Sequence, residues 1–194
     1  MRVAGIDYGS KHAGTTVVAG FNGSSITLVQ SAKKEDADLF ILKWARQYHP
    51  AFIFLDAPLS LPGKYRYPDH YEDYFYRKAD RALGAMSPMF LGGLSARAMQ
   101  LAEQLRAMNI EVWEAYPAYL AKILELGPER YKKREEDIPA IRQQLEAHLP
   151  EGCCPERVSS WHQIDALLAL ITGLRYSRKE HLTFGQVEEG LIIV

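Results

Sequence analysis

The chain has 194 residues, which is long enough to bury a sizeable core, and we expect a single domain over residues 1–194. Acidic and basic residues nearly balance, with a formal net charge of −1, which excludes a strongly basic coat for non-specific nucleic-acid binding. No apolar run reaches the length of a membrane span, and no signal peptide is visible. The adjacent Cys153 and Cys154 cannot form a zinc site alone, so we expect a reduced, cytoplasmic protein.

The first third of the chain predicts three strands, a helix and a fourth strand. Asn22-Gly23 is a hairpin signal, and His49-Pro50 ends an amphipathic helix. The wholly apolar run that follows is typical of a strand covered on both faces. Because the helix makes a crossover, this strand should lie parallel in the sheet. The predicted strands are Val3–Asp7, Thr15–Phe21, Ser25–Ala32 and Phe52–Leu55, and the predicted helix is Asp36–Tyr48.

The middle of the chain is less regular. An insert at about residues 60–92 is rich in proline and aromatic residues. Its tyrosines could stack on bases, pack a subdomain or form a dimer interface. Beyond the insert we expect helices at Leu94–Met108, Ala118–Leu126, Ile138–His148 and Trp161–Tyr176, a fifth strand at Glu111–Tyr116 and a final strand at Val187–Val194.

The order of these elements predicts the fold. Three antiparallel strands, followed by alternating helices and strands, are typical of a ribonuclease-H-like α/β fold. We therefore expect a five-stranded mixed sheet with helices on both faces and the first strand at its centre. In such a sheet, ligands bind where the carboxyl ends of the first and fourth strands flank the switch point. Asp7 and Asp56 occupy those two ends.

Three aspartates are the main candidates for a site. Asp7 precedes a Gly-Ser turn with little side-chain bulk, Asp56 ends the fourth strand, and Asp165 lies in an apolar helix, where an unpaired acid is costly. Converging carboxylates repel each other, and Mg²⁺ or Mn²⁺ with oxygen ligands would remove that cost. The alternatives are a turn-closing role for Asp7 and Asp56, and a buried ion pair with an arginine for Asp165.

Two further residues are candidate catalytic groups. Glu114 on the fifth strand is either a metal ligand or a partner for Arg77 or Arg97. His162 lies one helical turn before Asp165 on the same side of the helix. The alternative for His162 is an ordinary polar residue at the start of a helix.

Basic and polar residues supply candidate substrate contacts. Ser10 and Lys11 could touch phosphate through the turn after the first strand, although a solvated lysine explains Lys11 equally well. Arg77 is a third candidate, unless it pairs with Asp80 one turn away. The basic run Arg130–Arg134 is followed at once by three acidic residues, so we expect a solvated surface there.

Several motifs resemble known families. Residues Gly5–Gly14 resemble the first strand and turn of the RuvC and YqgF branch of the ribonuclease-H-like superfamily, and His162–Ala169 resembles the catalytic carboxy-terminal helix of RuvC-type nucleases. Other stretches are similar to the domain-of-unknown-function family four-two-nine, described as predicted ribonuclease-H-like nucleases: Leu55–Pro62, Arg77–Asp80, Glu114–Pro117 and Glu189–Val194.

The resemblance implies a metal-dependent nuclease that hydrolyses phosphodiester bonds in DNA or RNA. In a RuvC-like mechanism, Asp7 would bridge two Mg²⁺ or Mn²⁺ ions, Asp56 and Asp165 would each complete one site, and His162 would act as ligand or proton carrier. Two other functions stay open. One is a nucleotide-binding phosphotransfer protein of the actin and sugar-kinase type, and the other is a non-catalytic binding protein with the same fold. The aromatic insert and the final strand offer surfaces for a homodimer.

Overall fold

The computed structural model describes residues 2–127 and 129–194, which fold around a mixed sheet in the order β3-β2-β1-β4-β5-β7-β6. β4 and β5 run parallel to β1, whereas β2 is antiparallel to both β1 and β3. β7 runs parallel to β5, and β6 closes the far edge antiparallel to β7. The strands are β1 Val3–Asp7, β2 Val17–Phe21, β3 Ile26–Gln30, β4 Phe52–Asp56, β5 Glu111–Ala115, β6 Thr183–Gln186 and β7 Gly190–Ile193.

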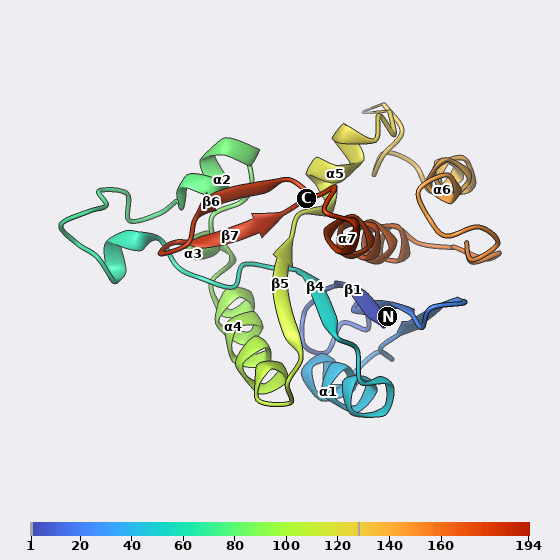
Figure 1. Cartoon of the computed structure of the whole chain (residues 1–194), viewed down its shortest axis with the longest axis horizontal. Coiled ribbons are helices and arrows are strands. Elements are labelled where there is room, and N and C mark those ends of the chain that lie inside the picture. Colours follow the sequence, from blue (N-terminus) through green and yellow to red (C-terminus); the bar gives the residue numbers. More distant parts are fainter. Residues whose placement is uncertain (1, 128) are drawn as a thin grey trace.

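Helices cover both faces of the sheet. Figure 1 shows α1 and α4 on one side of β1, β4 and β5, and α7 on the other. In the described residues, no helix combines the length and the apolar character that a membrane span requires. The helices are α1 Ala37–Tyr48, α2 Lys78–Leu83, α3 Pro88–Leu91, α4 Gly93–Arg106, α5 Pro117–Ile123, α6 Ile138–Glu146 and α7 Trp161–Arg178, with 3₁₀ turns at Gly63–Tyr65 and Glu135–Asp137.

The ribonuclease-H-like α/β fold is confirmed, with an interior first strand and parallel fourth and fifth strands. The sheet has seven strands rather than the expected five. β6 gave no clear signal in the sequence because it is short, mostly exposed and interrupted by Gly185, whose φ is 103°. The final strand begins at Gly190 rather than Val187, because residues 187–189 form the turn between β6 and β7.

Two apolar cores pack against the two faces of the sheet. One lies beneath α1 and α4, and the other is built around α7, which is buried along most of its length. α7 approaches β1 closely at Gly5, where an added Cβ would lie 2.0 Å from the backbone nitrogen of Leu170. Only glycine permits this approach, and it sets the height of α7 above the end of β1. Since α7 carries Asp165 and His162, this packing positions two of the predicted site residues.

Candidate metal centre

Three aspartates from separate elements converge at the carboxyl ends of β1 and β4. Asp7 and Asp56 end these two strands and are paired in the parallel register. Asp165 reaches them from α7, and one carboxylate oxygen from each aspartate lies within 4.8 Å of the other two. Asp7 is 8% exposed and Asp165 is 2% exposed, while Asp56 is partly buried. The three aspartates that the sequence analysis named as candidates therefore form one compact cluster.

The electrostatics of the cluster favour a cation. Burial raises the pKa of Asp56 well above its ordinary value, and repulsion from Asp165 and Asp7 raises it further. Burial also raises the pKa of Asp165, an effect that the ammonium group of Lys132 partly offsets. Ionised carboxylates at this density are costly without a counter-charge. All three ligands are carboxylate oxygens, the donor type that Mg²⁺ and Mn²⁺ prefer.

The size of the cluster also suits one such ion. Two oxygens bound to the same Mg²⁺ lie about 3–4.2 Å apart, since each bond is about 2.1 Å long. The upper limit of 4.8 Å between the three oxygens is therefore only slightly wider than a bound ion requires. Asp7, Asp56 and Asp165 fit a hard divalent cation both in chemistry and in spacing.

His162 joins the cluster through Asp7. Its Nδ1 lies 2.8 Å from Oδ2 of Asp7, and this hydrogen bond raises the pKa of His162. The carboxylate can only accept a hydrogen bond, so Nδ1 is the donor. The imidazole is 45% exposed and therefore reachable from solvent. Ser160 caps the amino terminus of α7 by accepting a hydrogen bond from the backbone of Gln163, which fixes the turn that carries His162.

Lys132 and Tyr131 are site residues that sequence reasoning missed. Nζ of Lys132 lies 2.5 Å from Oδ2 of Asp165, and the hydroxyl group of Tyr131 donates to Oδ1 of the same carboxylate. Lys132 lies at the surface as expected, with its side chain 47% exposed, but its ammonium group forms an ion pair that the sequence did not indicate. The neighbouring charges cancel along the sequence, and the tertiary fold alone directs Lys132 towards α7. The partner of Asp165 is thus a half-exposed lysine, not an arginine in a buried ion pair.

Glu114 and Arg77 form a separate buried network beside the cluster. Two nitrogens of the guanidinium group each donate to Glu114 at 2.7 Å, and the same group bonds Asp80 and the hydroxyl group of Ser60. Burial acts to lower the pKa of Arg77, but its hydrogen bonds to Glu114 and Asp80 outweigh this effect and raise it. Arg77 is 1% exposed and its guanidinium group is held by Glu114, Asp80 and Ser60, so its role as a substrate contact stays a prediction.

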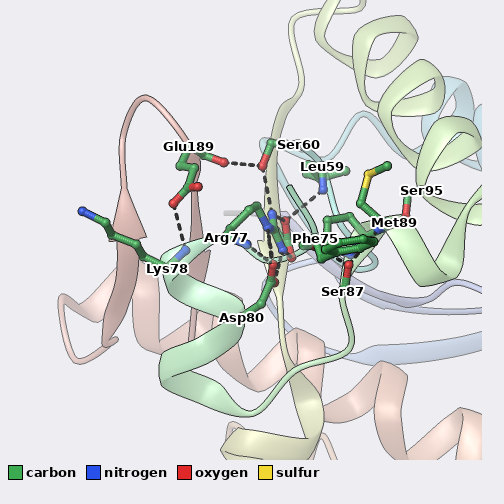
Figure 2. A network of polar contacts seen from close by, with 12 residues as sticks. Leu59, Ser60, Phe75, Arg77, Lys78, Asp80, Ser87, Met89, Ser95 and Glu189 are labelled. Carbon is green, nitrogen blue, oxygen red and sulfur yellow. Dashed lines mark hydrogen bonds and ion pairs between the residues drawn. The ribbon is translucent and has the colours of Figure 1, made fainter. Parts of the chain in front are cut away.

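The network attaches the aromatic insert to the sheet. Ser60 donates to the carbonyl oxygen of Glu189, and the carboxylate of Glu189 accepts from the backbone of Gly63 and Lys78. Figure 2 shows the contacts of Glu189 with Ser60 and Lys78 beside the hydrogen bonds of Arg77. The partner alternative for Glu114 therefore matches its contacts, and Arg97 pairs instead with Asp38 at 2.7 Å. The motifs around Arg77, Glu114 and Glu189 meet in one hydrogen-bonded network, and the catalytic role of Glu114 stays a prediction.

The turn after β1 lies apart from these contacts. Lys11 forms an ion pair with Asp36, with Nζ and Oδ2 3.1 Å apart, and Ser10 is exposed. Within the described residues, no hydrogen bond or ion pair joins Ser10 or Lys11 to the three aspartates. Their role as substrate contacts stays a prediction.

A cavity of about 350 Å³ opens beside the cluster. Asp56 and Lys132 line it together with Glu114, and Met86 and Leu91 of the insert contribute apolar wall. Its volume is at the lower end of the range for ligand pockets. One part of the cavity wall therefore comes from the aspartate cluster and another from the insert.

The chain thus combines a ribonuclease-H-like fold with a cluster of three converging carboxylates. The chain belongs to the family described as "Protein of unknown function (DUF429)", whose model matches residues 5–189. Two solved structures of Thermus thermophilus RuvC are similar to it, one of them in complex with a Holliday junction substrate. They are 18% and 15% identical, each with a TM-score of 0.47, and each alignment covers 92% of this chain and 96% of the RuvC chain. A search of curated proteins finds no match.

Proposed function

We propose that this protein is a metal-dependent nuclease that hydrolyses phosphodiester bonds in nucleic acid. The observation that carries the proposal is the convergence of Asp7, Asp56 and Asp165, with one oxygen from each within 4.8 Å of the others. Three buried or partly buried carboxylates on three elements are unfavourable together unless a cation binds them. Their position at the carboxyl ends of parallel strands is where α/β sheets bind ligands.

The three aspartates would hold Mg²⁺ or Mn²⁺. At such a site a divalent ion activates water and offsets the charge that develops on a phosphate. Asp7 also orients His162, because its carboxylate fixes the proton on Nδ1 and leaves the Nε2 lone pair available. On a half-exposed ring, Nε2 can accept a proton from the attacking water or pass one to the leaving oxygen. The Arg77 network holds the insert, and with it the cavity wall, in place beside the cluster.

Cleavage assays test this proposal. The purified chain is incubated with Mn²⁺ and labelled single-stranded, duplex, RNA–DNA hybrid and four-way-junction substrates, with a chelator as the metal-free control. We expect Mn²⁺-dependent cleavage by the wild type and loss of at least about a hundredfold in rate for Asp7→Asn. Asp69→Asn, which changes an exposed aspartate in the insert, is the matched control and should cleave like the wild type.

Equal cleavage by the wild type and Asp7→Asn would contradict the proposal, because the activity would then come from another site or another protein. Absence of cleavage combined with tight Mn²⁺ binding would favour the non-catalytic binding protein instead. Thermal stabilisation by ATP without cleavage would favour the phosphotransfer alternative.

A further inference from the structure

Lys132 is held directly against the aspartate cluster. Its Nζ lies 2.5 Å from Oδ2 of Asp165, a side chain that is only 3% exposed, whereas Lys132 itself is 47% exposed. In the described part of the chain, Lys132 and His162 are the basic residues that form ion pairs with the three aspartates. The ammonium group of Lys132 thus places a positive charge beside the predicted metal centre.

The local structure fixes this placement. Lys132 adopts a left-handed backbone conformation with a φ of 58°, which is uncommon for a residue with a side chain. The preceding Tyr131 donates its hydroxyl group to the other oxygen of Asp165, and its ring packs edge-to-face on Trp161 at 5.7 Å between centroids. Two consecutive residues therefore bind the two oxygens of one carboxylate.

The charges at the cluster suggest what Lys132 does. With the imidazole of His162 neutral, as the proposed function uses it, three ionised aspartates carry three negative charges, and the ammonium group of Lys132 offsets one of them. The two that remain match one divalent ion, whereas two divalent ions together with Lys132 would leave an excess of positive charge. Both oxygens of Asp165 already have a partner, Tyr131 at Oδ1 and Lys132 at Oδ2, so a second ion bound to Asp165 would have to share an oxygen with one of these groups.

We propose that Lys132 takes the place of a second metal ion, so that the site binds one divalent ion and uses the ammonium group as its second positive charge. This inference rests on the proposed function. An ammonium group has three donors, so after one hydrogen bond to Asp165 two are left for phosphate oxygens. Lys132 lines the cavity next to Asp56, so a phosphate entering there meets both the ion and the lysine. Tyr131 acts as a positioning residue through Asp165.

The number of bound ions tests the inference. Mn²⁺ is titrated into the full chain by calorimetry, and electron paramagnetic resonance distinguishes an isolated ion from a coupled pair. We expect one Mn²⁺ per wild-type chain with the spectrum of an isolated ion. Lys132→Met, which keeps the length of the side chain but removes its charge, should bind a second ion and bind the first about tenfold more tightly. Lys132→Arg should bind one ion, and Lys133→Met, which changes the exposed neighbouring lysine, should behave like the wild type.

The outcomes separate this inference from the proposed function. Two ions in the wild type, or one ion in both the wild type and Lys132→Met, would overturn the role of Lys132 while leaving a metal centre. No Mn²⁺ in any folded variant, as judged by circular dichroism, would overturn the metal centre itself and the inference with it.

Discussion

Replacing Gly5 by alanine should damage both the stability of the protein and its metal centre. A Cβ at this position would lie 2.0 Å from the backbone nitrogen of Leu170 and 2.4 Å from the carbonyl oxygen of Ala166. A carbon atom cannot approach backbone atoms much below about 3 Å, so α7 must move roughly 1 Å away from β1. The clash is with helix backbone rather than with a flexible side chain, so no rotamer change can relieve it.

The cost follows from this displacement. Overpacking a core costs about 1–3 kcal/mol, and a backbone clash belongs at the upper end of that range. In a protein of this size, such a loss lowers the midpoint of thermal unfolding by roughly 6–12 °C. The same shift separates Asp165 from Asp7, and Mn²⁺ affinity should fall by at least about tenfold, because small divalent ions require close and regular oxygen ligands.

Two measurements check this prediction: urea or thermal unfolding without metal, and Mn²⁺ titration of the folded protein. Gly93→Ala is the matched control, since no heavy atom lies within 4 Å of a Cβ built there. That change at the start of α4 should leave Mn²⁺ affinity unchanged and stability equal or up to about 1 kcal/mol higher. Wild-type stability and Mn²⁺ affinity in Gly5→Ala would refute the account of how α7 is placed.

Three other changes test the electrostatics. Arg77→Met strands two buried carboxylates and should cost about 3–5 kcal/mol in urea unfolding, whereas Arg81→Met, at an exposed ion pair, should cost less than about 1 kcal/mol. Equal losses would show that the buried network contributes nothing special. Asp165→Asn relieves repulsion and frees only a half-exposed lysine, so the metal-free melting temperature should hold or rise while stabilisation by Mn²⁺ shrinks. A large metal-independent loss would remove Asp165 from the ligand set. The pKa of Asp56 is raised in the folded state, so its contribution to stability is fully present below about pH 4, where the carboxyl group is protonated in both the folded and the unfolded chain. As the pH rises through the raised pKa, this contribution is lost, and the free energy of unfolding measured without metal should fall. Asp56→Asn should flatten that fall in unfolding curves recorded between pH 4 and 8, and an unchanged slope would contradict the assignment.

Much of the fold could be predicted because its signals are local. The amphipathic helix α1, its end at His49-Pro50 and the apolar run of β4 each reflect residues close together in the sequence. β6 could not be predicted in this way. It is held by its pairing with β7, and its own residues are mostly exposed.

The site residues also fall into those that the sequence indicated and those that only the tertiary fold revealed. Asp7 and Asp56 stand out because strand ends in a parallel sheet meet at one edge, and Asp165 stands out because it interrupts an apolar helix. The contact of Lys132 with Asp165 spans a long stretch of chain, and nothing in the local charge pattern indicates it. Similarly, the sequence allowed two roles for Glu114, a metal ligand or the partner of an arginine. Its contact with Arg77 is formed only in the tertiary fold. The roles of these residues in catalysis stay predictions.

A crystal of the full chain soaked in Mn²⁺ tests the central claim most directly. Anomalous difference density should show a peak within about 2.0–2.6 Å of a carboxylate oxygen from each of Asp7, Asp56 and Asp165. The corresponding peak should be absent or much weaker in Asp7→Asn crystals grown in the same form. A fully soaked wild-type crystal with no peak at the three aspartates, or with Mn²⁺ bound only elsewhere on the chain, would contradict the metal centre on which the proposed nuclease function depends.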